Sequence, residues 1–192
     1  MNRTLIAIVL ALALIPGLAM AQPWTAADIA LSGTAGSGSN ASYLVVDFGS
    51  ASYAFNYLWN TPQTGTVTGA DLIGALSDQA TGVPGLSYAG TVWPDMGLAV
   101  DSFGYDGHSG VSNYPDPWWN YWTGAAGGTQ ESSGVGCSSR ELSNGSIDSW
   151  VFSTDWTQAP NIPGVPEPSS LLALCSLIGL VGSARLLRRS RK

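Results

Sequence analysis

The chain has 192 residues, a formal net charge of −6 and two cysteines, a length that argues for one domain together with processing segments. All thirteen acidic residues lie between Asp28 and Glu167, whereas Arg140 is the only Lys or Arg between Arg3 and Arg185. A body this acidic repels phosphate groups, so we expect no nucleic-acid partner. The same charge is consistent with a solvated surface or with attraction of cations.

Residues 1–21 show the pattern of a secretory signal peptide. Arg3 provides a positive start, an apolar run covers residues 5–20, and Ala19 and Ala21 form a small-x-small cleavage site. The alternative is an N-terminal membrane anchor, but the run is short for a span and Pro16 interrupts it. We expect cleavage after Ala21, followed by a flexible segment at 22–41 that contains the small-residue stretch GTAGSGSN.

The body at 42–158 is expected to be an acidic, aromatic-rich α+β domain with one main helix. The helix is predicted at 68–82, because Thr68 and Asp71 have the spacing of a capping box and apolar residues then recur at helical spacing. β-branched and aromatic runs predict strands, the first two joined by a turn at Gly49 and Ser50: 42–48, 52–59, 85–93, 98–105, 120–124 and 148–154.

Aromatic residues are concentrated in DPWWNYWTG at 116–124 and again near LSNGSIDSWVF at 142–152. This order resembles the transcobalamin-like C-terminal domain, a β-grasp-type module of cobalamin carriers and bacterial surface proteins. The resemblance implies a small β-grasp-like fold and, as one function, binding of a corrinoid-type ligand. Ser146 stands where that family usually has Asp, which weakens an inherited ligand role.

The candidate ligand platform comprises Trp118, Trp119, Tyr121 and Trp122. Tryptophan and tyrosine stack on sugar rings or flat macrocycles through an apolar face and a polar edge. In a strand, Trp118 and Trp122 would share one side while Trp119 and Tyr121 share the other. The alternative is that one of these stripes is simply the core, since a small domain without disulfides needs large buried side chains.

Other chemical sites are weakly supported. Asp101, Asp106 and Asp116 lie near His108 in a loop that could hold a cation, although their spacing does not match an EF-hand. His108 could serve as a base for a Cys137 nucleophile, but nothing orients the pair. Established catalytic motifs are missing from the sequence. We therefore expect a protein that is not an enzyme, with no catalytic residues, no metal and no cofactor.

The C-terminal end combines three features in a fixed order. A proline-rich linker at 159–168 carries Pro166, Glu167 and Pro168, and an apolar segment follows at 169–187. About 18 residues at roughly 1.5 Å each span about 27 Å, close to a bilayer core, so a transmembrane helix is expected. Five cations close the chain, the last four of them in the basic tail at 188–192, and predict that this end is cytoplasmic: Arg185, Arg188, Arg189, Arg191 and Lys192.

This tail resembles the PEP-CTERM sorting signal, which implies an exosortase partner that cuts near Pro-Glu-Pro in a bacterium exporting extracellular polysaccharide. The expected product is an exported protein, first an inner-membrane-anchored precursor and then a biofilm-matrix or cell-surface protein. An ordinary anchor that is never cut is the alternative. The same tail occurs on proteins classed as ice-binding, but it carries no information about ice.

Three roles remain open for the body. The first is a structural or binding module that contacts polysaccharide through exposed tryptophans, the second is a corrinoid-type ligand binder, and the third is a matrix hydrolase.

Overall fold

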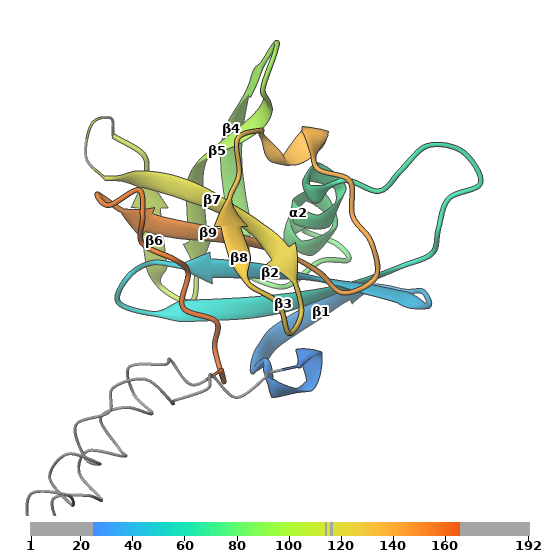
Figure 1. Cartoon of the computed structure of the whole chain (residues 1–192). Helices are drawn as coiled ribbons and strands as arrows, with labels where there is room; N and C mark the ends of the chain where they lie inside the picture. The colour runs from blue at the N-terminus through green and yellow to red at the C-terminus, as the bar shows by residue number, and fades with distance from the viewer. Residues whose placement is uncertain (1–24, 114, 116, 166–192) are drawn as a thin grey trace, which may run out of the picture. The chain divides into compact units, whose positions relative to one another are not determined.

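The computed structural model describes residues 25–113, 115 and 117–165. It is 45% strand and 11% helix, with two sheets and one α-helix (Figure 1). The expectation of an α+β, β-grasp-like domain is therefore wrong, and the fold is mostly β. The error arises because sequence periodicity shows single strands but not their pairing, and three short strands in Gly- and Ser-containing segments were not expected: β1 (Leu31–Gly36), β6 (His108–Val111) and β8 (Gln130–Ser132).

The larger sheet has six strands in the order β1-β3-β2-β9-β7-β8. It is mixed, because β1 runs parallel to β3 and β2 runs parallel to β9, whereas the remaining neighbours are antiparallel. Besides β1 and β8 its members are β2 (Asn40–Asp47), β3 (Ser52–Trp59), β7 (Trp118–Ala125) and β9 (Ser146–Ser153). The β2–β3 hairpin confirms the turn predicted at Gly49, whose φ of 80° favours glycine.

The central strands of this sheet are covered on both faces. Residues 42–47 of β2 and 146–151 of β9 are all buried. Alternate side chains enter two apolar clusters: Leu44 and Trp150 belong to the main one, whereas Val45 and Ile147 belong to a smaller one on the opposite face. Continuous burial explains why the middle of this strand, YLVV at 43–46, is a continuous apolar run rather than an alternating one.

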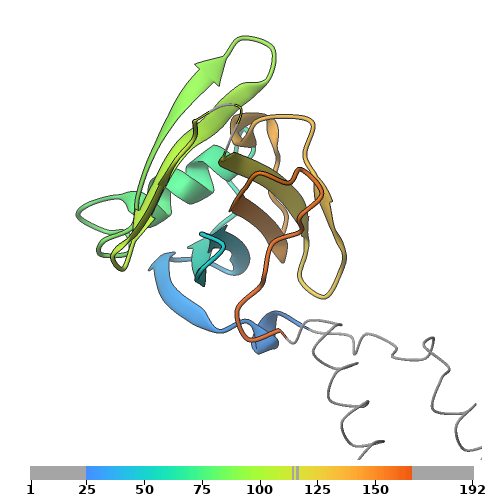
Figure 2. The ribbon, with the colours of Figure 1, turned by 90° about the vertical axis from the view of Figure 1, so that its left-hand side faces the viewer.

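The second sheet is an antiparallel three-stranded unit made of β4 (Ser87–Trp93), β5 (Gly97–Tyr105) and β6. In Figure 2 it forms a layer of its own, with the helix α2 (Gly69–Ser77) next to it. This helix contacts β1, β2, β3 and β4. Its buried Leu72, Ile73 and Leu76 join the main cluster.

The start of α2 confirms the predicted capping box. The side chain of Thr68 accepts the N–H of Asp71 at 3.3 Å, and the Asp71 carboxylate accepts the N–H of Thr68 at 2.8 Å. The helix ends at Ser77 rather than at 82. Its C-cap Asp78 accepts the N–H groups of Ala80 and Thr81, and this local turn replaces further helical bonds.

Two segments expected to lie outside the domain belong to it. The segment 22–41 was expected to be flexible, but its residues 25–41 contain a 3₁₀ turn (Ala26–Asp28), β1 and the start of β2. Residues 159–165 were expected to be an extended linker. Instead the Asn161 N–H donates to Asp47 at 2.9 Å, the Ala30 N–H donates to the carbonyl of Pro163 at 2.8 Å, and Ile162 packs on the smaller cluster.

Within residues 25–113, 115 and 117–165, no helix has the length and apolar character needed to cross a membrane. The residues on which the predictions for the two chain ends rest lie outside the described residues. These are the signal peptide with Ala19 and Ala21, the motif Pro166, Glu167 and Pro168, the apolar segment 169–187, and the cations Arg185, Arg188, Arg189, Arg191 and Lys192.

Candidate functional site

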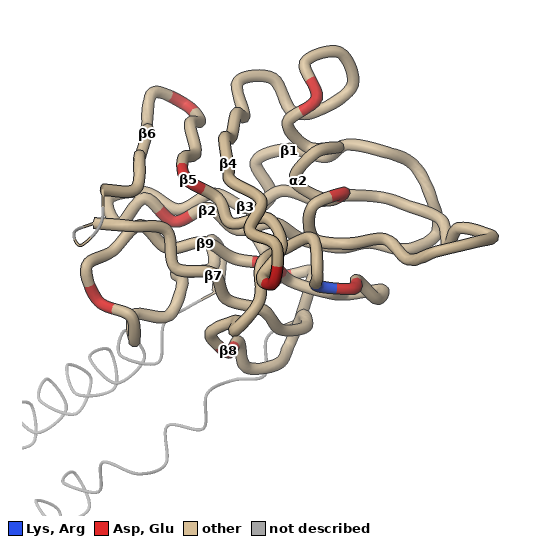
Figure 3. Tube along the Cα trace, turned by 90° about the horizontal axis from the view of Figure 1, so that it is seen from above, with Lys and Arg blue, Asp and Glu red and all other residues tan. Residues whose placement is uncertain are grey.

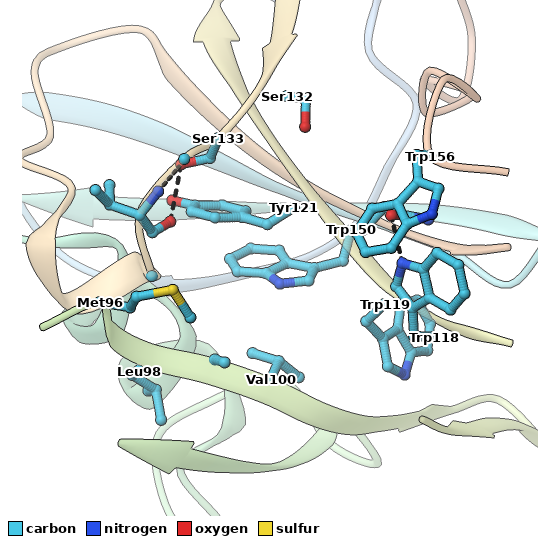
Figure 4. A pocket seen from close by; sticks show the side chains of 15 residues that line it. Met96, Leu98, Val100, Trp118, Trp119, Tyr121, Ser132, Ser133, Trp150 and Trp156 are labelled. Carbon is cyan, nitrogen blue, oxygen red and sulfur yellow. Dashed lines mark hydrogen bonds between the residues drawn. The ribbon is translucent and has the colours of Figure 1, made fainter. Parts of the chain in front are cut away.

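A pocket of about 230 Å³ lies between β5, β7 and the loop that follows β8 (Figure 4). One wall is aliphatic and comes from β5 and the residue before it. A second wall is aromatic and comes from β7, β9 and the chain after β9. The third is the Ser- and Gly-rich loop 132–136. Its lining includes Met96, Leu98, Val100, Trp118, Trp119, Asn120, Tyr121, Ser132, Ser133, Trp150 and Trp156.

The pocket exists because β8 is too short to cover its neighbour. The three residues of β8 pair only with Trp122, Thr123 and Gly124 of β7, so within the described residues no strand pairs with the 118–121 half of that edge. The chain then leaves the ladder, with the Ser133 N–H still donating to the Tyr121 carbonyl at 2.8 Å. Gly136 lies so close to the start of β5 that a Cβ would stand 2.6 Å from the Leu98 carbonyl oxygen, so only glycine lets this loop approach β5 so closely.

The aromatic wall is built on a cross-strand pair. Tyr121 of β7 is directly opposite Trp150 of β9, and their rings stack with centroids 4.3 Å apart at 16°. Trp150 is only 2% exposed, so it belongs to the core and supports Tyr121 from below. Next to this pair, Trp119 packs edge-on against Phe103 and donates its indole N–H to the Gly110 carbonyl at 3.1 Å.

A second aromatic pair forms the outer rim. Trp118 and Trp156 have ring centroids 4.2 Å apart at 46°. The indole N–H of Trp118 donates to Oδ1 of Asn120 at 2.6 Å, which orients the ring. Trp156 is 61% exposed, an unusual exposure for a tryptophan in a domain of this size. The rim therefore offers a rigid apolar surface to the solvent.

The structure brings Trp118, Trp119 and Tyr121 of the expected platform together in the lining. Trp122 is not part of it: this side chain is 9% exposed, and the residue pairs with Ser132 of β8 at the covered end of β7. The sequence reasoning missed Trp150 and Trp156 as lining residues. Trp150 alternates within a predicted strand, but its contact with Tyr121 depends on the β7–β9 register, which no local pattern shows.

A buried carboxyl group lies behind the aromatic wall. Asp148 of β9 is 0% exposed, and the Tyr121 hydroxyl donates to its Oδ2 at 2.6 Å. Burial raises the pKa of Asp148 from 3.8 to about 6, although Tyr121 and Arg140 act to lower it. Burial and the neighbouring Asp148 raise the pKa of Tyr121 well above its ordinary value of 10.

Arg140 and Cys137 complete this cluster. Arg140 Nε lies 3.6 Å from Oδ1 of Asp148, and Nη1 donates to the Glu141 carbonyl at 2.9 Å. Cys137 is buried, its thiol donates to the Leu98 carbonyl at 3.3 Å, and burial raises its pKa to about 12. A thiol with so high a pKa is protonated at neutral pH and is a poor nucleophile.

The residues of the suspected cation loop have other contacts. Asp101 accepts the hydroxyl of Thr91 at 2.7 Å, Asp106 accepts the hydroxyl of Tyr53 at 3.1 Å, and His108 packs on Phe48 with ring centroids 5.7 Å apart. Asp116 lies outside the described residues. Among the residues that are described, no three of the types that bind metal gather at one place.

Comparisons with protein-family models, with curated proteins and with solved structures found no match. The geometry of the pocket and the pattern of the sequence therefore carry the functional argument.

Proposed function

We propose that this protein is an exported surface or matrix protein whose body binds glycans through the aromatic pocket. The observation that carries the proposal is the combination of a stacked Tyr121–Trp150 wall with a Trp118–Trp156 rim, of which Trp156 is exposed, around one pocket. Aromatic rings pack against the apolar faces of sugar rings, while hydroxyl and backbone groups satisfy the sugar hydroxyls. Ser132 supplies such a hydroxyl group in the lining, whereas the Ser133 hydroxyl donates to the Val135 carbonyl at 2.8 Å.

The size of the pocket favours part of a chain over a large ligand. Its volume of about 230 Å³ is below the roughly 300–1,000 Å³ of pockets that enclose drug-sized ligands. A sugar chain can place a single ring in such a pocket and extend along the rim. A corrinoid would be held only by one edge or face, so corrinoid binding stays a prediction for which the pocket offers no specific support.

Delivery by an exosortase is the second part of the proposal. Pro166, Glu167 and Pro168, the apolar segment and the five cations support it at the level of sequence. The division of the chain adds support, because one compact unit covers Trp24–Val165 and so ends directly before the proline motif. A cut at the motif would leave that unit whole.

We propose a binding role rather than a catalytic one, in line with the protonated thiol of Cys137.

Glycan binding is tested by tryptophan fluorescence of the full chain in detergent, titrated with oligosaccharides of the producer's own matrix. We expect quenching or a spectral shift, and Trp156→Ala should weaken binding about tenfold, equivalent to about 1.4 kcal/mol. The matched control is Trp93→Ala, which removes a 52% exposed tryptophan from β4 outside the pocket. An equal loss of glycan affinity in both variants would contradict the proposal. So would the absence of any change in fluorescence with every glycan tested.

Sorting is tested by the intact mass of the protein recovered from the producing cells. The expected mass lacks residues 1–21 and the residues after the proline motif, and any additional mass belongs to a group attached at the new C-terminus. Replacing Glu167 with Ala should keep the C-terminal segment on the protein. Recovery of the unprocessed chain from the cytosol of wild-type cells would rule the sorting proposal out.

A further inference from the structure

We infer that the pocket selects uncharged glycans and rejects acidic ones. This inference rests on the proposed function and names the class of glycan. Its first ground is the lining itself: none of the fifteen residues around the pocket is Asp, Glu, Lys, Arg or His. The lining is aromatic, aliphatic, or carries hydroxyl, amide and backbone groups only, which are the partners of a neutral sugar ring.

The second ground is that, within the described residues, no Lys or Arg side chain is placed to meet a sugar carboxylate or sulfate in the pocket. Arg140 is the only Lys or Arg of the described body (Figure 3). Its guanidinium faces Asp148 at 3.6 Å and donates to the carbonyls of Glu141 and Gly124, and Arg140 is not part of the lining. A carboxylate that enters an aromatic pocket without a cationic partner loses part of its hydration and gains few polar interactions that compensate for the loss.

The third ground is the position of the acidic residues along the chain. Three exposed acids directly precede lining residues: Asp95 before Met96, Glu131 before Ser132 and Asp155 before Trp156. Neighbouring Cα atoms are about 3.8 Å apart, so the backbone positions that carry these acids lie well within a Debye length, about 10 Å at 0.1 M salt, of the lining residues. The Asp155 carboxylate accepts the N–H and hydroxyl of Thr157, which lower its pKa and keep it ionised. An anionic polymer is therefore repelled from the entrance.

The test compares a neutral glucose oligomer with a uronic-acid oligomer of equal length, using tryptophan fluorescence of the full chain. We expect the neutral oligomer to bind at least about tenfold more tightly at low salt. The difference in affinity between the two oligomers should decrease at high salt, because the Debye length falls from about 30 Å at 0.01 M to about 3 Å at 1 M. If the uronic-acid oligomer binds equally or more tightly, the inference is overturned while glycan binding stands.

Two further arms separate the alternatives. An oligomer of glucosamine with free amines should bind more tightly than the uronic-acid oligomer at low salt, because the exposed acids that repel an anion attract a cation; binding as weak as that of the uronic-acid oligomer would show that the acids do not act at the entrance and would overturn the inference. If none of the oligomers binds, it is the proposed function that fails.

Substitution of a single acidic residue isolates the electrostatic contribution to the rejection of acidic glycans. Glu131→Gln removes the charge next to Ser132, and we expect affinity for the uronic-acid oligomer to rise about two- to threefold with neutral binding unchanged. Glu141→Gln is the matched control, because Glu141 follows Arg140 and neither it nor Arg140 lines the pocket. Equal effects of the two substitutions would show that net charge alone matters and would contradict selection at the pocket.

Discussion

Asp148 is a buried acid whose charged form is less stable in the folded protein than in the unfolded chain. It is 0% exposed, the Tyr121 hydroxyl and Arg140 Nε are its polar neighbours, and the buried thiol of Cys137 lies in the same cluster. Its pKa of about 6 in the folded state exceeds the ordinary 3.8, so the folded protein binds this proton more tightly than the unfolded chain. The stabilisation that the protonated Asp148 carboxyl group contributes is fully present below about pH 3.8. It is lost as the pH rises through about 6.

This linkage predicts the effect of Asp148→Asn. In the native protein the free energy of unfolding should fall by about 2 kcal/mol between about pH 4 and pH 7, since one pKa unit corresponds to about 1.4 kcal/mol and the carboxyl group in the unfolded chain is already partly ionised at pH 4. The variant cannot ionise, and its stability should lack this slope. Urea unfolding followed at several pH values measures it. Asp101→Asn, in β5, is the control and should retain the slope; a slope that persists in Asp148→Asn would show that another group causes it.

At the scale of elements, α2 contains two glycines in very different surroundings. A Cβ on Gly69 would overlap Oδ2 of Asp148 and stand 2.9 Å from the Cys137 carbonyl, whereas a Cβ on Gly74 would meet nothing within 4 Å. The first turn of the helix therefore lies directly on the Asp148 cluster and the later turn does not.

The two glycines predict opposite effects of one substitution. Gly69→Ala should destabilise the protein by about 1–3 kcal/mol, because the clash forces α2 or β9 to move. Gly74→Ala should stabilise it by about 0.5–1 kcal/mol, because alanine loses less backbone entropy in a helix. Urea denaturation midpoints compare the two variants. A stabilising Gly69→Ala would disprove the close approach of helix and strand.

On the scale of the whole molecule, the chain after β9 ties the ends of the domain together. Asn161 accepts the Ser52 hydroxyl and donates its N–H to Asp47, while Pro163 accepts the N–H of Ala30. Residues up to Val165 thus help to close the smaller apolar cluster. Processing after this point would leave these contacts intact.

Two truncations test this role. A chain that ends at Val165 should be as stable towards urea as the full chain, whereas one that ends at Ala159 should lose about 2–4 kcal/mol, from three hydrogen bonds of roughly 1 kcal/mol each and the contacts of Ile162. Equal stability of the two truncated chains would show that the segment does not hold the domain together.

Local signals in the sequence predicted single elements well. The strand at 52–59 has the bounds of β3, and the Thr68–Asp71 pair caps α2 as expected. Short elements were missed, since β8 has three residues and β6 has four, too few for an alternating pattern to stand out. The fold class was wrong for this reason and because local patterns do not contain strand order.

For the pocket, too, the sequence predicted the local features and missed those that depend on contacts between distant segments. The sequence pointed to Trp118, Trp119 and Tyr121 because aromatic residues cluster there, but it also included Trp122, which is buried where β8 pairs with β7 and does not line the pocket. Trp150 and Trp156 could not be found this way. Each meets its partner, Tyr121 or Trp118, across a strand pairing or a chain reversal.

By itself, the sequence determined the local elements, the acidic character of the body and the pattern of its two ends, since each depends on residues a few positions apart. Only the tertiary structure decided which aromatic rings meet, which acid is buried and where a pocket remains open. The physical reason is that strand register and the short reach of β8 arise from packing between distant segments, and that packing acts on the whole core at once.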